Sequence, residues 1–583
     1  MTMLTKWGAA LDCAHPLPEY PRPQLRRESF LNLNGVWDYA VTASGDEPEA
    51  WDGEIVVPFS PEAPLSGAER GPARDEYLHY RRSFTLPEGF QKSRVLLHFG
   101  AVDQIAEVFV NGVSAVKHSG GYWPFSADIT SLLREGENLL RVTVRDNADD
   151  PTFAYGKQRY KRGGMWYTAQ SGIWQTVWLE SVPEVYVKSL RITPGFDAAR
   201  VRIELDTAGE SAAITCDVRG ADGSFVAGSW AKDGVCVVPL PGFRAWTPDD
   251  PYLYTLDITC GEDRVESYFA MRKFSYVELG GHKVFGLNNA PLFHNGLLDQ
   301  GYYPDGLLTP PSDEAMVNDI ETMKRCGFNM LRKHIKIEPL RWYYHCDRLG
   351  MIVWQDMVSG GQPYSFLHVS ALPTLGKVDL PDKDAKPYGR SGMLSRARFR
   401  REMADTVRLL YNCPCIALWT VFNEGWGQFD ALDMANELKK LDATRFIDHA
   451  SGWQDQGYEE MKSRHIYFRP VKLKNDGRAL ALTEYGGYIL AVDGHRWTDK
   501  VFGYRICRDG ASLARDYEKL MREQVLPHIS KEGLTAAVYT QITDVEEELN
   551  GLMTYDREVL KIPEETLREI NGALRFSASP DNM

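Results

Sequence analysis

Two short segments of the chain each carry a glutamate directly after a run of mostly apolar residues. They are Trp419-Thr-Val-Phe-Asn-Glu424 and Ala481-Leu-Thr-Glu484-Tyr-Gly-Gly. A buried strand of a parallel barrel has this composition and delivers a side chain to the barrel mouth, where active sites lie. Two carboxylates in one pocket can hydrolyse a glycosidic bond with retention, because one transfers protons while the other attacks the sugar carbon. Glu424 and Glu484 are therefore a candidate catalytic pair; the alternative is two ordinary strand-end glutamates.

The composition is typical of a folded protein with several domains. The 583 residues suggest three or four domains on length, and 43% are apolar and 25% charged. The net charge of −14 argues against a nucleic-acid partner, because phosphate binding needs a basic surface. No run of 18 apolar residues occurs, so we expect no membrane partner either.

The nine cysteines do not indicate a metal site or a disulfide framework. Cys413-Pro-Cys415 is their only close pair, and no His/Cys cluster has zinc spacing. Free thiols in a reducing compartment, and no metal or other cofactor, are the prediction. The N-terminus lacks the apolar stretch of a secretion signal, so a cytoplasmic location is expected.

Three domains are predicted from the change of periodicity along the chain. Residues 1–182 read as antiparallel strands, since segments 94–99, 105–110 and 140–145 alternate with period two. A jelly-roll β-sandwich is the natural architecture for this stretch. Residues 183–278 contain a second run of short strands, whose length suits one immunoglobulin-like β-sandwich.

Residues 279–583 alternate strands with helices and predict a catalytic (β/α)8 TIM barrel. Ser312 can cap a helix that Gly327 ends. Counted from about Leu292, Glu424 ends the fourth strand and Glu484 the seventh. Their carboxyls should then lie about 5 to 5.5 Å apart. The long connection from 360 to 387 is a candidate for shaping the pocket.

Five motifs, in order, resemble those of glycoside hydrolase family 2, which contains β-galactosidases, β-glucuronidases and β-mannosidases. Three lie in the first domain: the segments 33–38, 110–130 and 171–179 resemble the family's opening strand, its sugar-binding-like sandwich and the strand that closes it. Phe422-Asn-Glu-Gly425 and Thr483-Glu-Tyr-Gly486 resemble its two catalytic signatures.

The resemblance implies roles for the residues at the strand ends. Glu424 would be the acid/base, which needs a raised pKa, and Glu484 the nucleophile. Asn423 would contact the sugar 2-hydroxyl, Arg332 would bond Glu484, and His334 is either a sugar ligand or a structural histidine. Tyr467 resembles a family tyrosine that bonds the nucleophile. Other candidates for sugar contact are Asp299 after strand one, Asp356 at the end of strand three, Trp453 after strand five, His465 on strand six, and Gln541 and Asp544 after strand eight.

Two departures from the family narrow the expected substrate. The glucuronidases' Asn-x-Lys pair after strand eight is absent from Asn550-Gly-Leu-Met-Thr-Tyr555, and no histidine follows Asp356 to hold the magnesium of the large β-galactosidases. The predicted function is therefore an exo-acting retaining β-glycosidase for a neutral, galactose-like sugar. Lys333 and Lys336 are the cations that would reverse this preference if they entered the pocket.

Several alternatives stay open. They are a β-glucuronidase, an enzyme for mannosides, arabinosides or galactofuranosides, a transglycosylase, and a non-catalytic carbohydrate-binding protein. The expected partner is a small carbohydrate, and a homo-oligomer is possible.

Overall fold

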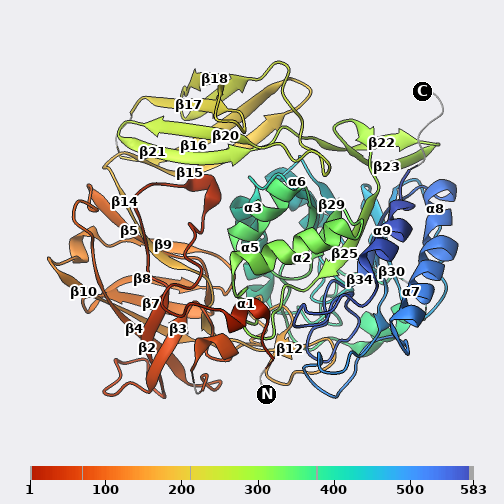
Figure 1. Cartoon of the computed structure of the whole chain (residues 1–583), viewed down its shortest axis with the longest axis horizontal. Coiled ribbons are helices and arrows are strands. Elements are labelled where there is room, and N and C mark those ends of the chain that lie inside the picture. Colours follow the sequence, from red (N-terminus) through yellow and green to blue (C-terminus); the bar gives the residue numbers. More distant parts are fainter. Residues whose placement is uncertain (1–2, 69, 210–211, 376–378, 577–583) are drawn as a thin grey trace.

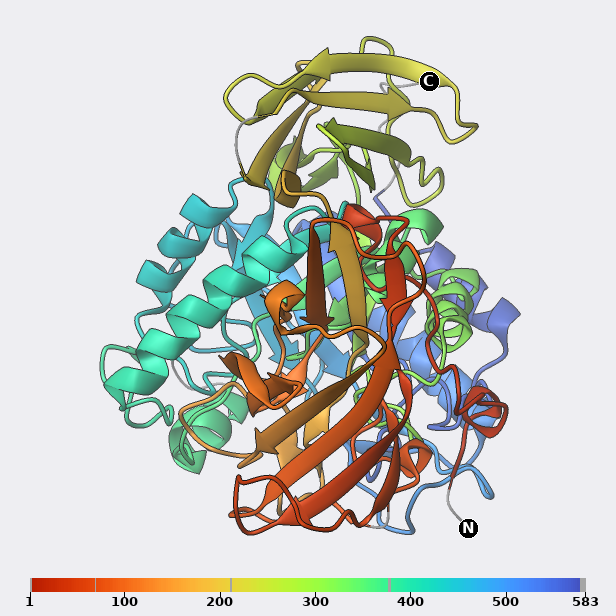
Figure 2. The ribbon, with the colours of Figure 1, turned by 90° about the vertical axis from the view of Figure 1, so that its left-hand side faces the viewer.

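The computed structural model describes residues 3–68, 70–209, 212–375 and 379–576. Two β-sandwiches lie against a parallel eight-stranded barrel (Figures 1 and 2). The N-terminal sandwich occupies the lower left of Figure 1, the second sandwich the top, and the barrel the right. Among the described residues, no helix is long and apolar enough to cross a membrane.

The N-terminal sandwich, called here the sandwich domain, is built from antiparallel strands, as the period-two alternation predicts. Trp37, Tyr80 and Leu97 are buried between its two sheets. One sheet has the order β1 (Phe30–Asn32), β14 (Val177–Val182), β5 (Arg94–Phe99) and β9 (Phe125–Asp128). The other has the order β3 (Gly53–Val57), β2 (Gly35–Thr42), β4 (Tyr77–Thr85), β10 (Glu137–Arg145), β7 (Ile105–Val110) and β8 (Val113–Ser119).

The second sandwich has the three-plus-four strand arrangement of a small immunoglobulin-like domain. Its sheets are β15 (Tyr186–Gly195), β16 (Arg200–Ala208) and β19 (Val235–Pro239), and β18 (Phe225–Trp230), β17 (Ile214–Arg219), β20 (Tyr254–Cys260) and β21 (Asp263–Phe269). Val201, Val218 and Leu256 are buried in its core. It lies above the barrel (Figure 2), and Arg27 joins it to the sandwich domain by donating to Glu180 on β14 and to Asp263 on β21.

A small sheet covers the amino-terminal end of the barrel. Its strands are β22 (Phe274–Leu279), β23 (His282–Leu287) and β24 (Ala290–Pro291). Phe285 on β23 stacks on Phe446 with ring centroids 4.3 Å apart, and the Phe285 N–H donates to the Thr535 hydroxyl oxygen at 2.6 Å. The predicted domain boundary at 278/279 falls inside β22, so the hairpin that covers the barrel begins at Phe274.

The barrel strands run parallel in the order β29 (Phe446–Asp448), β28 (Ile416–Thr420), β27 (Ile352–Asp356), β26 (Met330–Lys333), β25 (His294–Asp299), β34 (Leu534–Thr540), β31 (Ala479–Gly486) and β30 (Met461–Ile466). The two outer strands of this order, β29 and β30, are not joined by a ladder within the described chain. The barrel is therefore nearly closed, and the predicted multidomain fold is confirmed.

Helices surround the barrel as expected from their apolar stripes. Ser312 caps α2 by accepting the Ala315 N–H, and Gly327 follows that helix at φ +89°. The barrel helices are α2 (Asp313–Arg325), α3 (Leu340–Leu349), α4 (Leu372–Thr374), α5 (Met393–Leu410), α6 (Ala431–Leu441), α7 (Gly510–Lys519), α8 (Leu526–Lys531) and α9 (Glu564–Gly572). π-Helical segments span Leu367–Ala371 and Leu520–Val525, and 3₁₀ turns span Pro23–Leu25, Pro64–Ser66 and Thr130–Leu132.

The remaining short elements are helix α1 (Lys6–Ala9) and the strand pairs β6 (Val102–Asp103) with β13 (Gly172–Ile173), β11 (Gln158–Arg159) with β12 (Tyr167–Thr168), and β32 (Tyr488–Ile489) with β33 (Arg505–Ile506). β12 belongs to a loop of the sandwich domain that leaves the sheets and reaches the barrel; Figure 1 shows it in orange below the barrel. This loop contacts the barrel next to the candidate active site.

Candidate active site

Glu424 lies just beyond β28, at a bend in the backbone. Its φ of +55° is in the left-handed region, which costs a non-glycine residue about 1–2 kcal/mol. Two hydrogen bonds hold the bend: Trp453 Nε1 donates to the Glu424 carbonyl oxygen at 2.9 Å, and the Glu424 N–H donates to the Ser451 carbonyl at 2.9 Å. Strain of this kind is common at functional sites, where the surrounding contacts fix one side-chain direction.

Glu484 lies within β31, close to Glu424. His465 on β30 bridges the two, with Nδ1 2.9 Å from Glu424 Oε1 and 3.5 Å from Glu484 Oε2. An oxygen of each glutamate and a ring nitrogen of His465 all lie within 4.8 Å of one another. This separation fits direct attack by one carboxylate, since the inverting geometry places the two carboxyls about 6.5–9.5 Å apart.

Arg332 at the end of β26 fixes the position of Glu484. Its Nη1 donates to Glu484 Oε1 at 3.1 Å, and its Nε and Nη2 donate to the two oxygens of Asp356 at 3.0 Å. Nη2 also donates to Asn423 Oδ1 at 2.8 Å. Arg332 is fully buried, and its planar fork fixes three polar side chains from three different strand ends.

Tyr467 holds the other oxygen of Glu484. Burial raises the pKa of Tyr467 well above its ordinary value, so its hydroxyl stays protonated and donates to Glu484 Oε2 at 2.5 Å. The Tyr467 oxygen then accepts from the Thr540 hydroxyl at 2.9 Å. Tyr504 stacks on the Tyr467 ring, with centroids 4.0 Å apart, and keeps it in place.

The two glutamates have different surroundings. Burial raises the pKa of Glu424, and the charges of Lys157, His334 and Arg332 oppose this rise only in part. Glu484 instead receives charged and neutral donors on both oxygens. Glu424 thus has the raised pKa that an acid/base needs, and Glu484 has the hydrogen-bond donors that orient a nucleophile.

The two histidines of the site are neutral. Burial lowers the pKa of His465 to about 3 and lowers that of His334. Burial would raise the pKa of Asp356, but the charge of Arg332 and the His334 hydrogen bond bring it to about 2. Asp356 therefore accepts from His334 Nδ1 at 2.8 Å, which leaves Nε2 of the neutral ring as an acceptor for a hydroxyl.

Two of the predicted sugar contacts are engaged elsewhere. Asp299 accepts from Lys333 Nζ at 2.7 Å and from the Gly301 N–H, and Asp544 accepts from Lys561 Nζ at 2.6 Å. Their carboxylates neutralise buried lysines and do not join the Arg332 network. Gln541 donates to Asn550 Oδ1 at 2.8 Å, while its own Oε1 finds no partner among the described residues.

Lys333 and Lys336 do not supply a cation to the pocket. Both are about 1% exposed and both donate to Glu338 Oε1 at 2.8 Å. Lys336 also donates to the carbonyls of Gly301 and Leu308. These two lysines are therefore not the cations that would reverse the expected preference for a neutral sugar.

Several residues that border the pair are not among those predicted from the sequence. Lys157 and Tyr167 come from the sandwich domain, and Glu548 and Tyr504 from barrel connections. Tyr167 donates its hydroxyl to Glu548. Burial raises the pKa of Glu548, and the charge of Glu484 adds to that rise. The detectable signal is the dense polar and aromatic stretch Gly156-Lys-Gln-Arg-Tyr-Lys-Arg-Gly-Gly-Met-Trp166, which lies between strands of an otherwise alternating domain.

A metal ion is not needed to explain the cluster. Glu424, His465 and Glu484 offer oxygen and nitrogen donors at ligand spacing, so a divalent cation could occupy them. Two of the three are nevertheless already engaged: Glu484 by Arg332 and Tyr467, and His465 by Ser451, whose hydroxyl lies 3.2 Å from Nε2.

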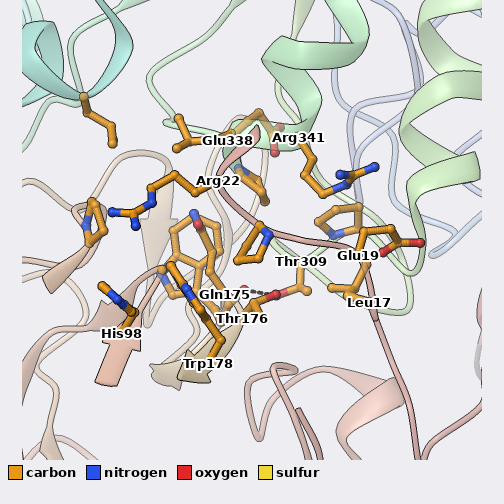
Figure 3. A pocket seen from close by; sticks show the side chains of 18 of the residues that line it. Leu17, Glu19, Arg22, His98, Gln175, Thr176, Trp178, Thr309, Glu338 and Arg341 are labelled. Atoms are coloured by element: carbon orange, nitrogen blue, oxygen red, sulfur yellow. Dashed lines mark hydrogen bonds between the residues drawn. The ribbon is translucent and has the colours of Figure 1, made fainter. Parts of the chain in front are cut away.

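A separate pocket of about 230 Å³ lies between the sandwich domain and the barrel helices (Figure 3). His98 and Trp178 line it from the sandwich, and Glu338 and Arg341 line it from the barrel side. Neither Glu424 nor Glu484 lines it. The catalytic geometry is therefore independent of this cavity.

Two family models match the chain, one in the sandwich domain and one in the barrel. A model described as "Glycosyl hydrolases family 2, sugar binding domain" matches residues 67–183, and one described as "Glycosyl hydrolases family 2, TIM barrel domain" matches residues 310–474. The chain is 25% identical over 387 residues to a β-galactosidase of Thermoanaerobacter pseudethanolicus. The aligned region covers 63% of this chain and 47% of that protein. It is 24% identical over 512 residues to a β-glucuronidase of Pongo abelii, which covers 77% of this chain and 73% of that protein.

Solved structures share the fold over nearly the whole chain. A β-glucuronidase from an uncultured Clostridium species superposes with a TM-score of 0.74 at 19% identity, covering 94% of this chain and 99% of that one. A family 2 β-galacturonidase from Eisenbergiella tayi superposes with a TM-score of 0.71 at 19% identity, covering 96% and 100%. The chain belongs to glycoside hydrolase family 2. It spans less than half the length of the T. pseudethanolicus relative, 47%.

Proposed function

We propose that the protein is a retaining β-glycosidase that removes a terminal sugar by double displacement. The observation that carries the proposal is the placement of Glu424 and Glu484 with oxygens within 4.8 Å, where burial raises the pKa of Glu424 and Arg332 and Tyr467 donate to Glu484. Their contacts match the demands of an acid/base and a nucleophile, respectively. A carbohydrate-binding protein without activity would have no need of this division.

The first step would form a covalent glycosyl-enzyme ester. A Glu484 oxygen attacks the anomeric carbon while the Glu424 proton passes to the departing glycosidic oxygen. Asn423, oriented by Arg332 Nη2, has its amide hydrogens available for the 2-hydroxyl of the sugar. Such a bond strengthens as charge develops on the ring and so lowers the activation free energy.

The second step would release the sugar with its original anomeric configuration. Glu424, now ionised, takes a proton from water as that water attacks the anomeric carbon, and Glu484 leaves as a carboxylate. Arg332 and Tyr467 stabilise the departing charge by the hydrogen bonds they already make to Glu484. Trp453, partly exposed beside His465, offers a ring face on which the sugar can stack.

For the sugar, a uronide has better support than the neutral galactoside expected from the missing Asn-x-Lys pair. Both β-galactosidases and β-glucuronidases occur among the curated relatives, whereas the structures of similar fold include several β-glucuronidases and a β-galacturonidase. The absence of the Asn-x-Lys pair removes one group that binds the sugar carboxylate, but a different cation can take that role. A neutral sugar is the second candidate, because Lys333 and Lys336 are paired within the barrel.

A panel of 4-nitrophenyl glycosides tests the proposal. Wild-type protein should release nitrophenol from at least one β-glycoside, and proton NMR of the first product should show the β-anomer. Glu484→Ala should abolish this release. Turnover of α-glycosides alone, or a first product of inverted configuration, would rule out the retaining β-glycosidase.

A further inference from the structure

The loop of residues 151–170, called here the sandwich loop, carries a cation to the candidate site. Its backbone is fixed to the barrel beyond the end of β27: the N–H groups of Tyr155 and Gly156 donate to the Ser359 carbonyl at 3.1 and 2.9 Å. Its far side is fixed by Thr168, whose N–H donates to Glu546 Oε1 at 2.8 Å. Lys157 lies between these anchors, next to the segment that follows His334.

Lys157 is 8% exposed, yet its ammonium makes no hydrogen bond or ion pair with any residue that the structure describes. Its Nζ lies 5.5 Å from the centre of the Trp166 ring, a contact that stabilises a cation only weakly in place of water. Lys333, Lys336 and Lys561 of the barrel domain differ in this respect. Each is bonded to a carboxylate: Lys333 and Lys336 to Glu338, and Lys561 to Asp544.

The charge of Lys157 acts on groups of the candidate site. Burial raises the pKa of Glu424, and among the charges that oppose this rise Lys157 is the largest. The same charge also acts on Glu548 and His334, which border the pair from two further directions. Backbone geometry agrees, since a Cβ at Gly156 would lie 3.0 Å from the Ile335 carbonyl oxygen.

Arg159 adds a second cation to the same face of the sandwich loop, the face formed with Lys157 and Trp166. The Arg159 guanidinium lies over the rings of Tyr155 and Trp166, 4.8 and 4.4 Å from their centres, and forms no ion pair within the described chain. Because neither cation has a direct carboxylate partner within the described chain, each can pair with an incoming anion. The charge of this face is therefore complementary to a substrate that carries a carboxylate.

We propose that Lys157 binds the carboxylate of a terminal β-linked uronic acid in the active site. The sandwich loop would thus supply, from another domain, the cation that the connection after the eighth strand lacks. Lys157 is then a specificity-determining residue that contacts substrate. This inference rests on the proposed function, because it assigns a substrate class to the same site.

The test compares Lys157→Gln with the matched control Lys161→Gln, which removes an exposed lysine of the same loop. Substrates are 4-nitrophenyl β-glucuronide, β-galacturonide, β-glucoside and β-galactoside. Wild-type protein should prefer a uronide, and Lys157→Gln should lower kcat/KM for it about 100-fold or more while changing the neutral glycosides about threefold or less. Lys161→Gln should behave like wild type. Equal losses on uronides and neutral glycosides, or a wild-type preference for a neutral sugar, would overturn the assignment.

Binding measured by calorimetry separates this inference from the proposed activity. Free glucuronate and galacturonate should bind wild-type protein more tightly than glucose and galactose, and Lys157→Gln should remove the difference. If this holds while no aryl glycoside is cleaved, the carboxylate site stands and the hydrolytic function fails. If neutral glycosides are cleaved while the uronates bind no better than the neutral sugars, the function stands and the role of Lys157 is refuted.

Discussion

Replacing Glu424 with alanine should slow cleavage by an amount that depends on the leaving group. A positioned acid contributes about 10²–10⁴-fold, or about 2.7–5.4 kcal/mol of activation energy. His465 cannot take over, because its pKa of about 3 leaves the ring neutral at neutral pH, and the N–H of a neutral imidazole is a very weak acid. The full loss should therefore appear with poor leaving groups such as alkyl or unsubstituted phenyl glycosides. Dinitrophenyl glycosides, which need little protonation, should react with Glu484 at a nearly unchanged rate. A plot of log kcat/KM against leaving-group pKa should thus be steep for Glu424→Ala and shallow for wild type.

Azide provides the decisive control for these roles. The vacated space beside the anomeric carbon admits a small anion, so azide should accelerate Glu424→Ala and yield the β-glycosyl azide. Glu484→Ala should lose turnover by more than about 10⁴-fold with every leaving group, because no ester can form. An α-glycosyl azide from Glu424→Ala would reverse the two assignments. A uniform loss across all leaving groups would show that Glu424 is not the acid.

Two further predictions concern protons and metals. Catalysis needs protonated Glu424, so kcat/KM should fall as pH rises through the Glu424 pKa, which lies above its usual value of 4.5. Lys157→Gln removes a charge that lowers this pKa, so in pH–rate profiles the fall should occur at higher pH than in wild type. Dialysis against EDTA should leave kcat/KM unchanged. Added Zn²⁺ should inhibit competitively by binding to Glu424, His465 and Glu484. Zinc inhibition should be lost in His465→Gln, which would identify the ligand set.

The elements that carry the candidate pair follow from local sequence signals. Buried apolar strands that end in polar residues are visible in the chain, and the carboxyl ends of parallel strands meet at one end of a barrel. Arg332, Asn423, His465 and Tyr467 could thus be predicted to lie near the pair from their strand-end positions and from the resemblance to the family's motifs. Ser312 and Gly327 likewise mark the ends of α2 by their local chemistry.

Side-chain partners could not be read in the same way. Asp299 and Asp544 occupy strand-end positions like that of Asp356, yet each neutralises a lysine that lies 34 or 17 positions along the chain. Whether a carboxylate faces substrate or a buried cation depends on which side chains fold back onto it. Lys157 could not be predicted for the same reason, since the residues that it faces at the site belong to a different domain.

The sandwich domain is part of the candidate site and not only a neighbour of it. Tyr167 donates to Glu548 across 381 positions, Gly164 N–H donates to Glu547 at 2.8 Å, and Thr168 N–H donates to Glu546 at 2.8 Å. Glu546 and Glu548 are buried at this contact, and burial raises the pKa of both, so their positions and pKa values are tied to the docked loop. The hydrogen bonds that hold Arg332, Glu424 and Glu484 all come from barrel residues, so a barrel without the sandwich loop would keep them. It would lack Lys157 and Trp166, and on the role proposed for Lys157 we expect it to lose the preference for an acidic sugar before it loses the groups that cleave the bond.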